Sequence, residues 1–325
     1  IMLFAYARNA FEYIIKNIKF ENDDYILLPD YNCDAVYQPI KKNKINHFFY
    51  RIDDYFSPDF QSIFDRAGKN LKAILVVNYF GQPLKINSLK QYCNDNNILL
   101  IEDNSHSYGG SHMNQKMGTI GDYGFSSPRK IINTPTGAIL YSNNNNLNCK
   151  FPIKRAKVEY KKFLLNFATL NNYNLREKVK AYFRQENKFD NPLFPGEPDV
   201  DYFLPDLFSE ALINMSNWDK ISEKRIKNWY KWSIFIKQKK FQIIFDHPLE
   251  KSCPWLMPFY IDSPKKRLKL LEISSKNGLG LSTWPTLTNE ALQTNNKLLD
   301  RWNKLVVINL NHTPSKYNEI LFKDI

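Results

Sequence analysis

Asp103 and Lys130 are the two ionisable residues whose sequence surroundings most strongly indicate a chemical role. Asp103 follows an apolar run at residues 98–101 and is followed by His106 and a glycine pair. A carboxylate at the end of a buried strand can bind a metal, act as a general base or pair with a protonated ring nitrogen. It can equally cap the following turn, so this segment alone leaves those alternatives open.

Lys130 lies in a loop between two apolar segments, preceded by Ser126 and Ser127 and followed by a turn of small residues. A lysine amine becomes a nucleophile only after it loses its proton, which partial burial and a neighbouring cation such as Arg129 favour. Because the chain has 45 lysines and arginines, a single lysine without further context is read as a solvated side chain. A chemical role therefore requires a fold that brings Lys130 to Asp103.

Alternating apolar runs and helical patterns predict such a fold. An amphipathic helix is expected to begin near Arg8, because apolar residues recur at helical spacing from Phe11 to Ile18, and its start is a candidate anion site. Buried parallel strands are expected at residues 25–28, 73–77, 98–101 and 138–141, with a crossover helix at residues 84–94. The pattern predicts an α/β fold, in which helices flank a mostly parallel sheet and ligands bind at the carboxyl ends of its strands.

The chain also shows one strong boundary signal. Residues 189–205 contain four prolines and a glycine, which is typical of an irregular connection. We therefore expect a large domain at residues 1–205, then a linking helix and a small α/β domain at residues 206–325. Apolar residues from Leu207 to Ile221 recur at helical spacing and predict one long helix, and residues 150–188 are expected to be largely helical.

Composition narrows the functional class. Hydrophobic residues make up 43% and aromatic residues 15%, which excludes a disordered chain. The net charge of +12 suits a diphosphate substrate, but the lysines are scattered and no nucleic-acid motif occurs, so we expect no nucleic-acid partner. The four cysteines lack metal-ligand spacing, so we expect no metal site. Neither a basic leader nor an apolar run of about 18 residues occurs, so we expect a cytoplasmic protein without a membrane partner.

Several motifs follow one another in a distinctive order. They are Glu-Asp-x-x-His-x-x-Gly-Gly at residues 102–110, Gly-Thr-Ile-Gly-Asp at 118–122, Phe-Ser-Ser-Pro-Arg-Lys at 125–130 and Thr-Gly-Ala-Ile-Leu at 136–140. In this order the chain resembles the DegT/DnrJ/EryC1/StrS family of nucleotide-sugar aminotransferases. The resemblance implies the fold-type-I architecture and pyridoxal 5'-phosphate (PLP) as the cofactor.

The resemblance also implies a role for each matched residue. Lys130 would form the Schiff base with the cofactor and transfer protons, Asp103 would hold the pyridine nitrogen, and His106 would lie near the ring and its phenolic oxygen. The other implied cofactor-binding residues are two at the helix start, two alternative hydroxyls at the phosphate, and two in the loop over one ring face: Arg8, Asn9, Ser126, Ser127, Tyr31 and Cys33.

The implied activity is transfer of an amino group to a nucleotide-linked keto-sugar, with L-glutamate as the usual donor, by a homodimer that serves amino-sugar and polysaccharide synthesis. Retention of Lys130 disfavours the related dehydratases, which have histidine there. The family's Asn-Tyr-Arg pattern is replaced by Asp201, Tyr202 and Phe203, and the chain begins close to Arg8, so we expect a changed substrate pocket. The alternative is a non-catalytic binding or regulatory protein that retains the fold.

Overall fold

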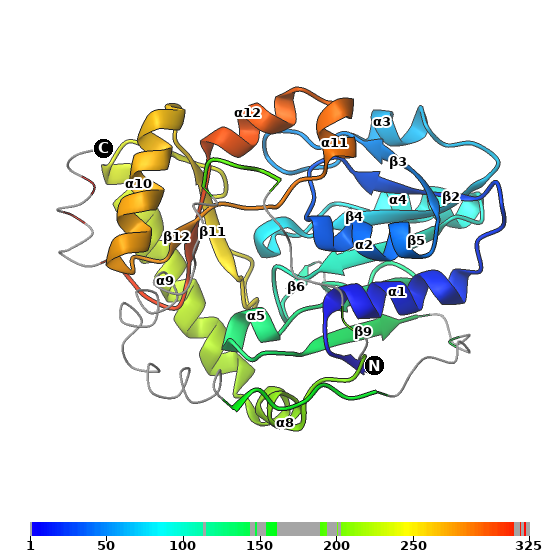
Figure 1. Cartoon of the computed structure of the whole chain (residues 1–325), viewed down its shortest axis with the longest axis horizontal. Helices are drawn as coiled ribbons and strands as arrows, with labels where there is room; N and C mark the ends of the chain where they lie inside the picture. Colours follow the sequence, from blue (N-terminus) through cyan, green and yellow to red (C-terminus); the bar gives the residue numbers. More distant parts are fainter. Residues whose placement is uncertain are drawn as a thin grey trace.

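The main element of the protein is a seven-stranded sheet, shown in the computed structural model of Figure 1, which describes residues 2–112, 115–143, 147, 154–160, 189–193, 200, 203–314, 319 and 322. Its strand order is β1-β9-β8-β5-β4-β2-β3. The strands are β1 (Met2–Phe4), β2 (Tyr25–Pro29), β3 (Asn46–Tyr50), β4 (Leu71–Val77), β5 (Leu99–Asn104), β8 (Tyr123–Ser126) and β9 (Ala138–Ser142). Five of them, β2, β3, β4, β5 and β8, are parallel, so their carboxyl ends meet at one edge.

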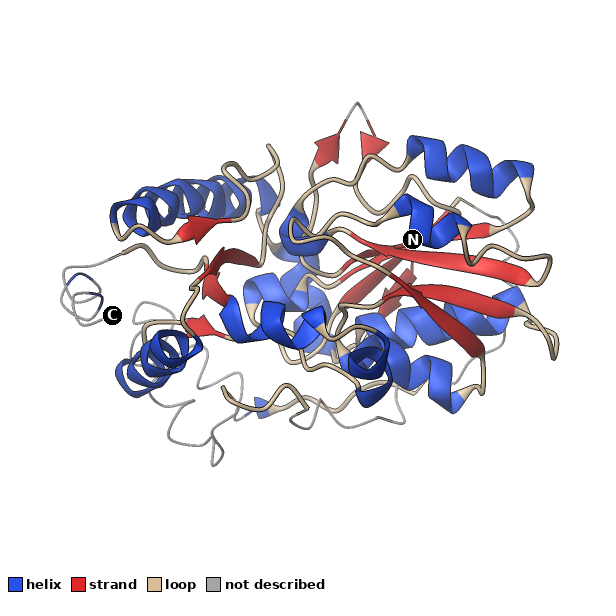
Figure 2. Ribbon diagram, turned by 90° about the horizontal axis from the view of Figure 1, so that it is seen from above, coloured by secondary structure: helices blue, strands red, loops and turns tan. Residues whose placement is uncertain are grey.

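Successive residues of the central strands enter different cores on the two faces of this sheet, as the two-residue period of a strand requires. Ile26 and Leu28 pack in a core with residues of α1 (Ala7–Ile18) and α2 (Asp34–Lys42). Leu27 packs in another core, with residues of α3 (Phe60–Phe64) and α4 (Asn87–Asp95). Figure 2 shows the strands between these helical layers. The predicted α/β fold with a mostly parallel sheet is confirmed.

The sequence located most of these elements. The helix expected near Arg8 is α1, and the strands expected at residues 25–28, 73–77 and 98–101 are β2, β4 and β5. The helix expected at residues 84–94 is α4, which begins at Asn87. The prediction of a parallel strand at residues 138–141 is wrong, because β9 pairs antiparallel with both β8 and β1. Only a short helix and a turn join β8 to β9, which is too little chain for a parallel crossover.

A second, four-stranded sheet lies in the C-terminal part of the chain and is antiparallel throughout, in the order β10-β11-β13-β12. Its strands are β10 (Gln242–Ile243), β11 (Leu256–Tyr260), β12 (Leu281–Ser282) and β13 (Leu305–Asn309). It shares a core with α9 (Trp218–Gln238) and α10 (Pro264–Asn277). Residues of α11 (Asn289–Thr294) and α12 (Lys297–Lys304) join the core of the large sheet instead. The division at residue 205 remains a prediction.

The prediction of one long helix from Leu207 is wrong. Two helices occupy that segment, α8 (Leu207–Met215) and α9, separated by Ser216 in an extended conformation. The side chain of Asn217 accepts a hydrogen bond from the Lys220 N–H and so caps the start of α9. Most of residues 150–188, and both Asp201 and Tyr202, lie outside the described residues.

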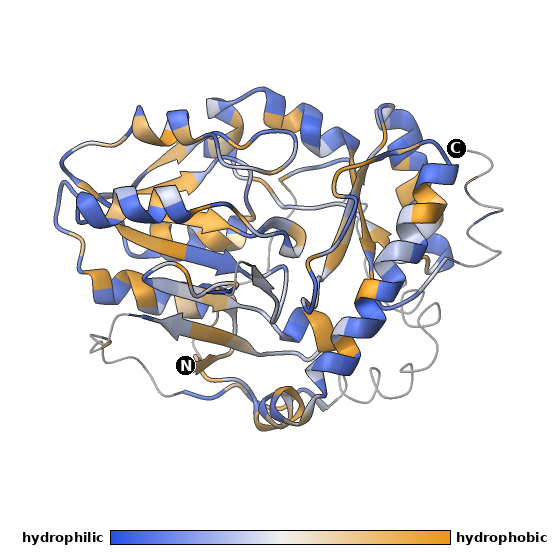
Figure 3. Ribbon diagram, turned by 180° about the vertical axis from the view of Figure 1, so that it is seen from behind, coloured by the Kyte–Doolittle hydropathy of each residue, from blue (hydrophilic) through white to orange (hydrophobic). Residues whose placement is uncertain are grey.

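The distribution of apolar side chains follows the two cores. In Figure 3 the strands of the large sheet are mostly orange, whereas the outer sides of the helices carry blue, hydrophilic residues. Within the described part of the chain, no helix has the length and apolar character that crossing a membrane requires.

Candidate active site

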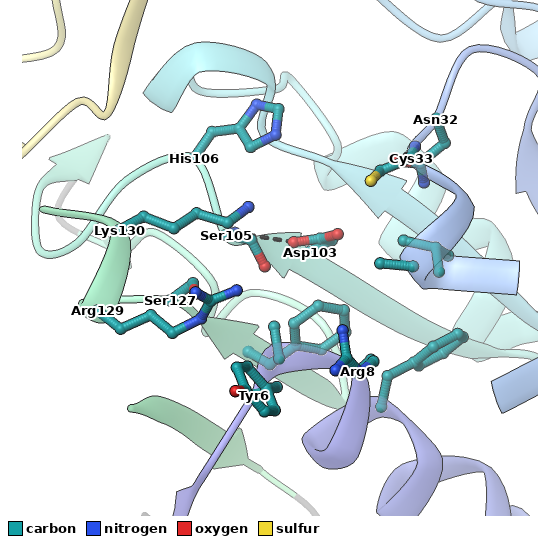
Figure 4. A pocket seen from close by; sticks show the side chains of 15 residues that line it. Tyr6, Arg8, Asn32, Cys33, Asp103, Ser105, His106, Ser127, Arg129 and Lys130 are labelled. Atoms are coloured by element: carbon teal, nitrogen blue, oxygen red, sulfur yellow. Dashed lines mark hydrogen bonds between the residues drawn. The ribbon is translucent and has the colours of Figure 1, made fainter. Parts of the chain in front are cut away.

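A pocket opens at the carboxyl edge of the large sheet, where the parallel strands end. Residues from four separate segments of the chain line it, and Figure 4 labels the polar and ionisable ones. They are Tyr6, Arg8, Asn32, Cys33, Asp103, Ser105, His106, Ser127, Arg129 and Lys130. The structure therefore brings together six of the nine predicted site residues: Arg8, Cys33, Asp103, His106, Ser127 and Lys130.

Asp103 occupies the position that the sequence predicted, near the end of β5 and directed into the pocket (Figure 4). Its carboxylate is buried and accepts a hydrogen bond of 2.8 Å from the Ser105 N–H. Burial raises the pKa of Asp103, while the Ser105 hydrogen bonds and the charge of Lys130 act in the opposite direction. A buried carboxylate of this kind suits a cationic or hydrogen-donating partner in the pocket.

Glu102 has a structural role that sequence reasoning missed. Adjacent strand residues point to opposite sides, so Glu102 faces away from Asp103 and accepts hydrogen bonds from the N–H groups of Gly118, Ile120 and Gly121. Burial raises the pKa of Glu102 in spite of these bonds. The sequence did contain a clue to this role. A turn such as the glycine-rich motif at residues 118–122 leaves N–H groups that need an acceptor, and the Glu-Asp pair offers a second carboxylate besides Asp103.

Lys130 lies in a single helical turn, α5 (Arg129–Ile132), directly after the end of β8. Pro128 precedes this turn, and Asn133 ends it in the left-handed conformation. Behind the turn, Gly137 has φ +129°, and a Cβ at this position would lie 2.2 Å from the Cδ1 atom of Ile213 on α8. The positive φ therefore favours glycine at this position, and α8 packs against the turn that carries Lys130.

His106 is buried among aromatic rings, with its ring centroid 4.6 Å from that of Trp284. Its Nδ1 accepts a hydrogen bond of 3.2 Å from the Phe80 N–H, which assigns the ring proton of the neutral form to Nε2. Burial and the charge of Lys130 hold the pKa of His106 well below its ordinary value. His106 is therefore neutral and can donate one hydrogen bond from Nε2.

The end of the pocket away from His106 carries two arginine side chains and is therefore cationic. The guanidinium carbons of Arg8 and Arg129 lie 4.5 and 4.7 Å from the centroid of the Tyr6 ring, which thus contacts both side chains (Figure 4). The hydroxyl of Ser127 is buried there and has no hydrogen-bond partner among the described residues. Because α1 also begins at this end of the pocket, the positive end of its helix dipole adds to the positive potential of the two arginines.

Three predicted site residues do not line the pocket. Ser126 is the last residue of β8, and its hydroxyl accepts a hydrogen bond of 3.3 Å from the side chain of Asn104, so Ser127 is the hydroxyl that reaches the pocket. The Tyr31 side chain is fully buried in the core, where its hydroxyl donates to the Trp284 carbonyl. Asn9 is buried within α1, one residue beyond Arg8.

The pocket also contains residues that sequence reasoning did not assign. Tyr6, Asn32 and Ser105 were not singled out, and Arg129 was considered only as a neighbour of Lys130. The Asn32 Nδ2 atom is buried without a hydrogen-bond partner in the part of the chain described, while its Oδ1 atom accepts the Cys33 N–H at 2.7 Å. Asn32, Ser105 and Arg129 could have been found from their positions, since each adjoins a predicted residue, whereas Tyr6 had no such signal.

Comparison with known proteins identifies the family. The model of the DegT/DnrJ/EryC1/StrS aminotransferase family matches residues 5–177, which is more than half of the chain. The chain belongs to this family. The match includes every residue of the pocket, from Tyr6 to Lys130.

Named members of the family match only part of this chain. The GDP-4-keto-6-deoxy-D-mannose 3-dehydratase of Escherichia coli O55:H7 is 29% identical over 117 residues, covering 35% of this chain and 30% of that protein. The UDP-4-amino-4,6-dideoxy-N-acetyl-beta-L-altrosamine transaminase of Campylobacter jejuni (serotype O:23/36) is 29% identical over 140 residues, covering 41% of this chain and 37% of that protein. The chain thus aligns with about a third of the length of these curated relatives.

Solved structures with the same fold match almost the whole chain. Helicobacter pylori PseC, an aminotransferase involved in the biosynthesis of pseudoaminic acid, superimposes with a TM-score of 0.68 at 14% identity, covering 99% of this chain and 84% of PseC. The Escherichia coli GDP-4-keto-6-deoxy-D-mannose-3-dehydratase with bound hydrated PLP gives a TM-score of 0.65 at 19% identity, covering 99% and 86% of the two chains. At these identities the likeness shows the fold, which is that of fold-type-I PLP proteins.

Proposed function

We propose that the protein is a PLP-dependent aminotransferase, with Lys130 as the residue that binds the cofactor covalently and transfers protons at the substrate carbon. The observation that carries this proposal is the convergence of Lys130, Asp103 and His106 on one pocket that also has a cationic end. Membership of the DegT/DnrJ/EryC1/StrS family supports it, because this family's description is that of an aminotransferase.

The residues present fit the cofactor. Arg8, Arg129 and the buried hydroxyl of Ser127, which has no hydrogen-bond partner among the described residues, form an anion-binding end suited to a phosphate. Asp103 provides a buried carboxylate that can accept a hydrogen bond from a protonated ring nitrogen. Three cationic side chains against one carboxylate leave the pocket with an excess of positive charge, which a dianionic phosphate would balance.

When bound, PLP supplies an electron sink for the carbon that loses or gains a proton. The residues of the chain would position the reacting groups and polarise the bonds at that carbon. Asp103 would keep a proton on the ring nitrogen, the Nε2–H of His106 would donate a hydrogen bond towards the ring, and the amine of Lys130 would carry a proton to or from the substrate carbon. Arg8, Arg129 and Ser127 would orient the cofactor by holding its phosphate.

We propose a nucleotide-linked keto-sugar as the amino acceptor and L-glutamate as the donor. The names of two relatives support this class, since one is a transaminase of a UDP-linked amino sugar and the other a dehydratase of a GDP-linked keto-sugar. The lysine at position 130 favours transamination over dehydration. The test is a screen of UDP- and GDP-linked keto-sugars with glutamate, in which the expected product has the mass of the amino-sugar and is absent with Lys130→Ala.

A non-catalytic binding protein is the alternative function, and the replacement of the family's Asn-Tyr-Arg pattern by Asp201, Tyr202 and Phe203 favours it. This alternative predicts that PLP binds but that no keto-sugar is aminated with any donor. Product formation from any member of the screen would exclude it.

We further propose a homodimer in the cytoplasm, with α8 in the subunit interface. Four apolar side chains of this helix are exposed: Leu207, Phe208, Leu212 and Met215. Figure 3 shows α8 at the edge of the molecule with a largely orange ribbon. Because α8 packs against α5, contact with a second copy would support the turn that carries Lys130. Sedimentation should show a dimer that Met215→Lys with Leu212→Lys converts to a monomer.

A further inference from the structure

Trp255 lies beside the pocket, in the segment that precedes β11. The Nζ atom of Lys130 lies 4.4 Å from the centroid of the Trp255 ring, over its face. An ammonium group in this position is attracted by the negative face of the indole, and tryptophan provides the strongest contact of this type. The interaction stabilises the charged form of the amine and does nothing for the neutral form.

The backbone holds Trp255 firmly against the site. Its N–H donates a hydrogen bond of 2.8 Å to the carbonyl of His106. Tyr108 and Cys253 exchange two further backbone hydrogen bonds, of 3.3 and 2.8 Å, so residues 253–255 run alongside the segment that follows Asp103. The ring therefore moves with the same segment that carries two of the proposed cofactor-binding residues.

A buried arginine fixes the same segment from the other side. Arg225 of α9 is 2% exposed and donates hydrogen bonds of 2.6 Å to the carbonyls of both Pro254 and Trp255. A guanidinium that binds two successive carbonyls restricts both peptide groups. The backbone from which the Trp255 ring extends over Lys130 is thus held by hydrogen bonds on both sides.

We infer that Trp255 is a positioning residue for Lys130: its ring face holds the amine in the protonated form and so sets the pH at which the amine becomes a nucleophile. The other charged groups at the pocket are Asp103, Arg8 and Arg129, and the titratable groups His106, Cys33 and Tyr6 also line it. All of these remain when only Trp255 is changed. The effect of Trp255 on the charge of Lys130 does not depend on the proposed function. Its importance for catalysis rests on that proposed function.

The test measures the amine directly and needs no cofactor. Cofactor-free protein is treated with a trace of acetic anhydride at a series of pH values, and acetylation of Lys130 is followed by peptide mass spectrometry. The neutral amine attacks a carbonyl carbon of the anhydride, the new C–N bond replaces a C–O bond, acetate leaves, and one amine proton passes to solvent. The pH midpoint of the labelling rate therefore reports the charge state of Lys130.

In Trp255→Leu the midpoint should fall by about one pH unit, so that labelling below the midpoint is about tenfold faster than in the wild-type protein. Trp255→Phe should shift it in the same direction by less, because phenylalanine keeps a weaker ring face. The control is Trp218→Leu, since Trp218 is also partly buried and packs on Tyr108 of the same segment, at 4.2 Å between ring centroids. This control should leave the midpoint unchanged.

An unchanged or higher midpoint in Trp255→Leu overturns the inference, as does an equal shift in Trp218→Leu. If Trp255→Leu does not fold, Trp255→Phe decides, and a midpoint equal to that of the wild type overturns the inference. Failure of the proposed function is seen separately. In that case PLP added to the wild-type protein neither protects Lys130 from labelling nor gives a visible absorbance band, while the labelling midpoints still test Trp255.

Discussion

Replacement of Arg129 by methionine should selectively weaken binding of the phosphate group. Arg129 lines the pocket with Arg8, and both guanidinium groups lie within 4.7 Å of the Tyr6 ring centroid. A hydrogen bond from a charged donor contributes about 1.5–3 kcal/mol, so loss of one such bond should raise the dissociation constant for PLP by about 10- to 150-fold. Because the methionine side chain is apolar and of similar length, the change removes mainly the charge.

The assay compares PLP with pyridoxal, which has the same ring and aldehyde but no phosphate. Titration by absorbance or tryptophan fluorescence should show that Arg129→Met loses affinity for PLP and keeps its affinity for pyridoxal. The control is Arg51→Met, because Arg51 is exposed and pairs with Asp59 at 2.8 Å, away from the pocket residues. An equal loss for both ligands, or no loss for PLP, would refute the assignment of Arg129 to the phosphate.

Three further changes test the supports of the site. Glu102→Gln should lower the free energy of unfolding by about 2–3 kcal/mol, because the amide nitrogen cannot accept the backbone N–H bonds that the carboxylate accepts; urea unfolding measures this, and an unaltered midpoint contradicts it. Burial holds the pKa of His106 well below 6.5, so the unfolded chain takes up a proton below about pH 6.5 that the folded chain does not. The free energy of unfolding should therefore fall by up to about 1.4 kcal/mol per unit as the pH drops from 6.5 towards the depressed folded pKa, and His106→Gln should remove that component. Gly137→Ala should destabilise the protein by about 1–3 kcal/mol in thermal unfolding, because alanine rarely adopts a φ of +129°; an unchanged melting temperature contradicts this.

The fold was predictable where local patterns and tertiary contacts agree. Apolar runs located β2, β4 and β5, and the helical period after Arg8 located α1, because these elements are buried on the faces that their patterns imply. The error at residues 138–141 has a different origin. A buried strand has the same apolar pattern whether it is parallel or antiparallel. The direction of β9 could therefore be inferred only from the length of its connection to β8.

The linking helix shows a second limit of sequence patterns. The apolar period from Leu207 to Ile221 continues across the break, but Asn217 caps a new helix, and Leu207 and Met215 are 63% and 83% exposed. A regular apolar period thus predicts an apolar helix face but does not predict what packs against that face. A single asparagine with its capping hydrogen bond outweighed that period.

The site was predictable to the extent that its residues adjoin ordered motifs. Asp103 and Lys130 converge as expected, because Asp103 lies near the carboxyl end of β5 and Lys130 lies just beyond the carboxyl end of β8, the adjacent parallel strand. Tyr6 and Trp255 were not predictable, since their roles depend on contacts with side chains or backbone distant in the sequence. The choice between Ser126 and Ser127 also needed the structure, because only the strand's alternation decides which hydroxyl faces the pocket.

The identity of the reactive amine can be measured most directly by borohydride reduction of the protein after incubation with PLP, followed by peptide mass spectrometry. The account predicts a stable pyridoxyl phosphate adduct on Lys130, which Lys130→Ala abolishes and Asp103→Ala weakens. An adduct confined to another lysine, or none at all on folded protein at saturating PLP, would contradict it.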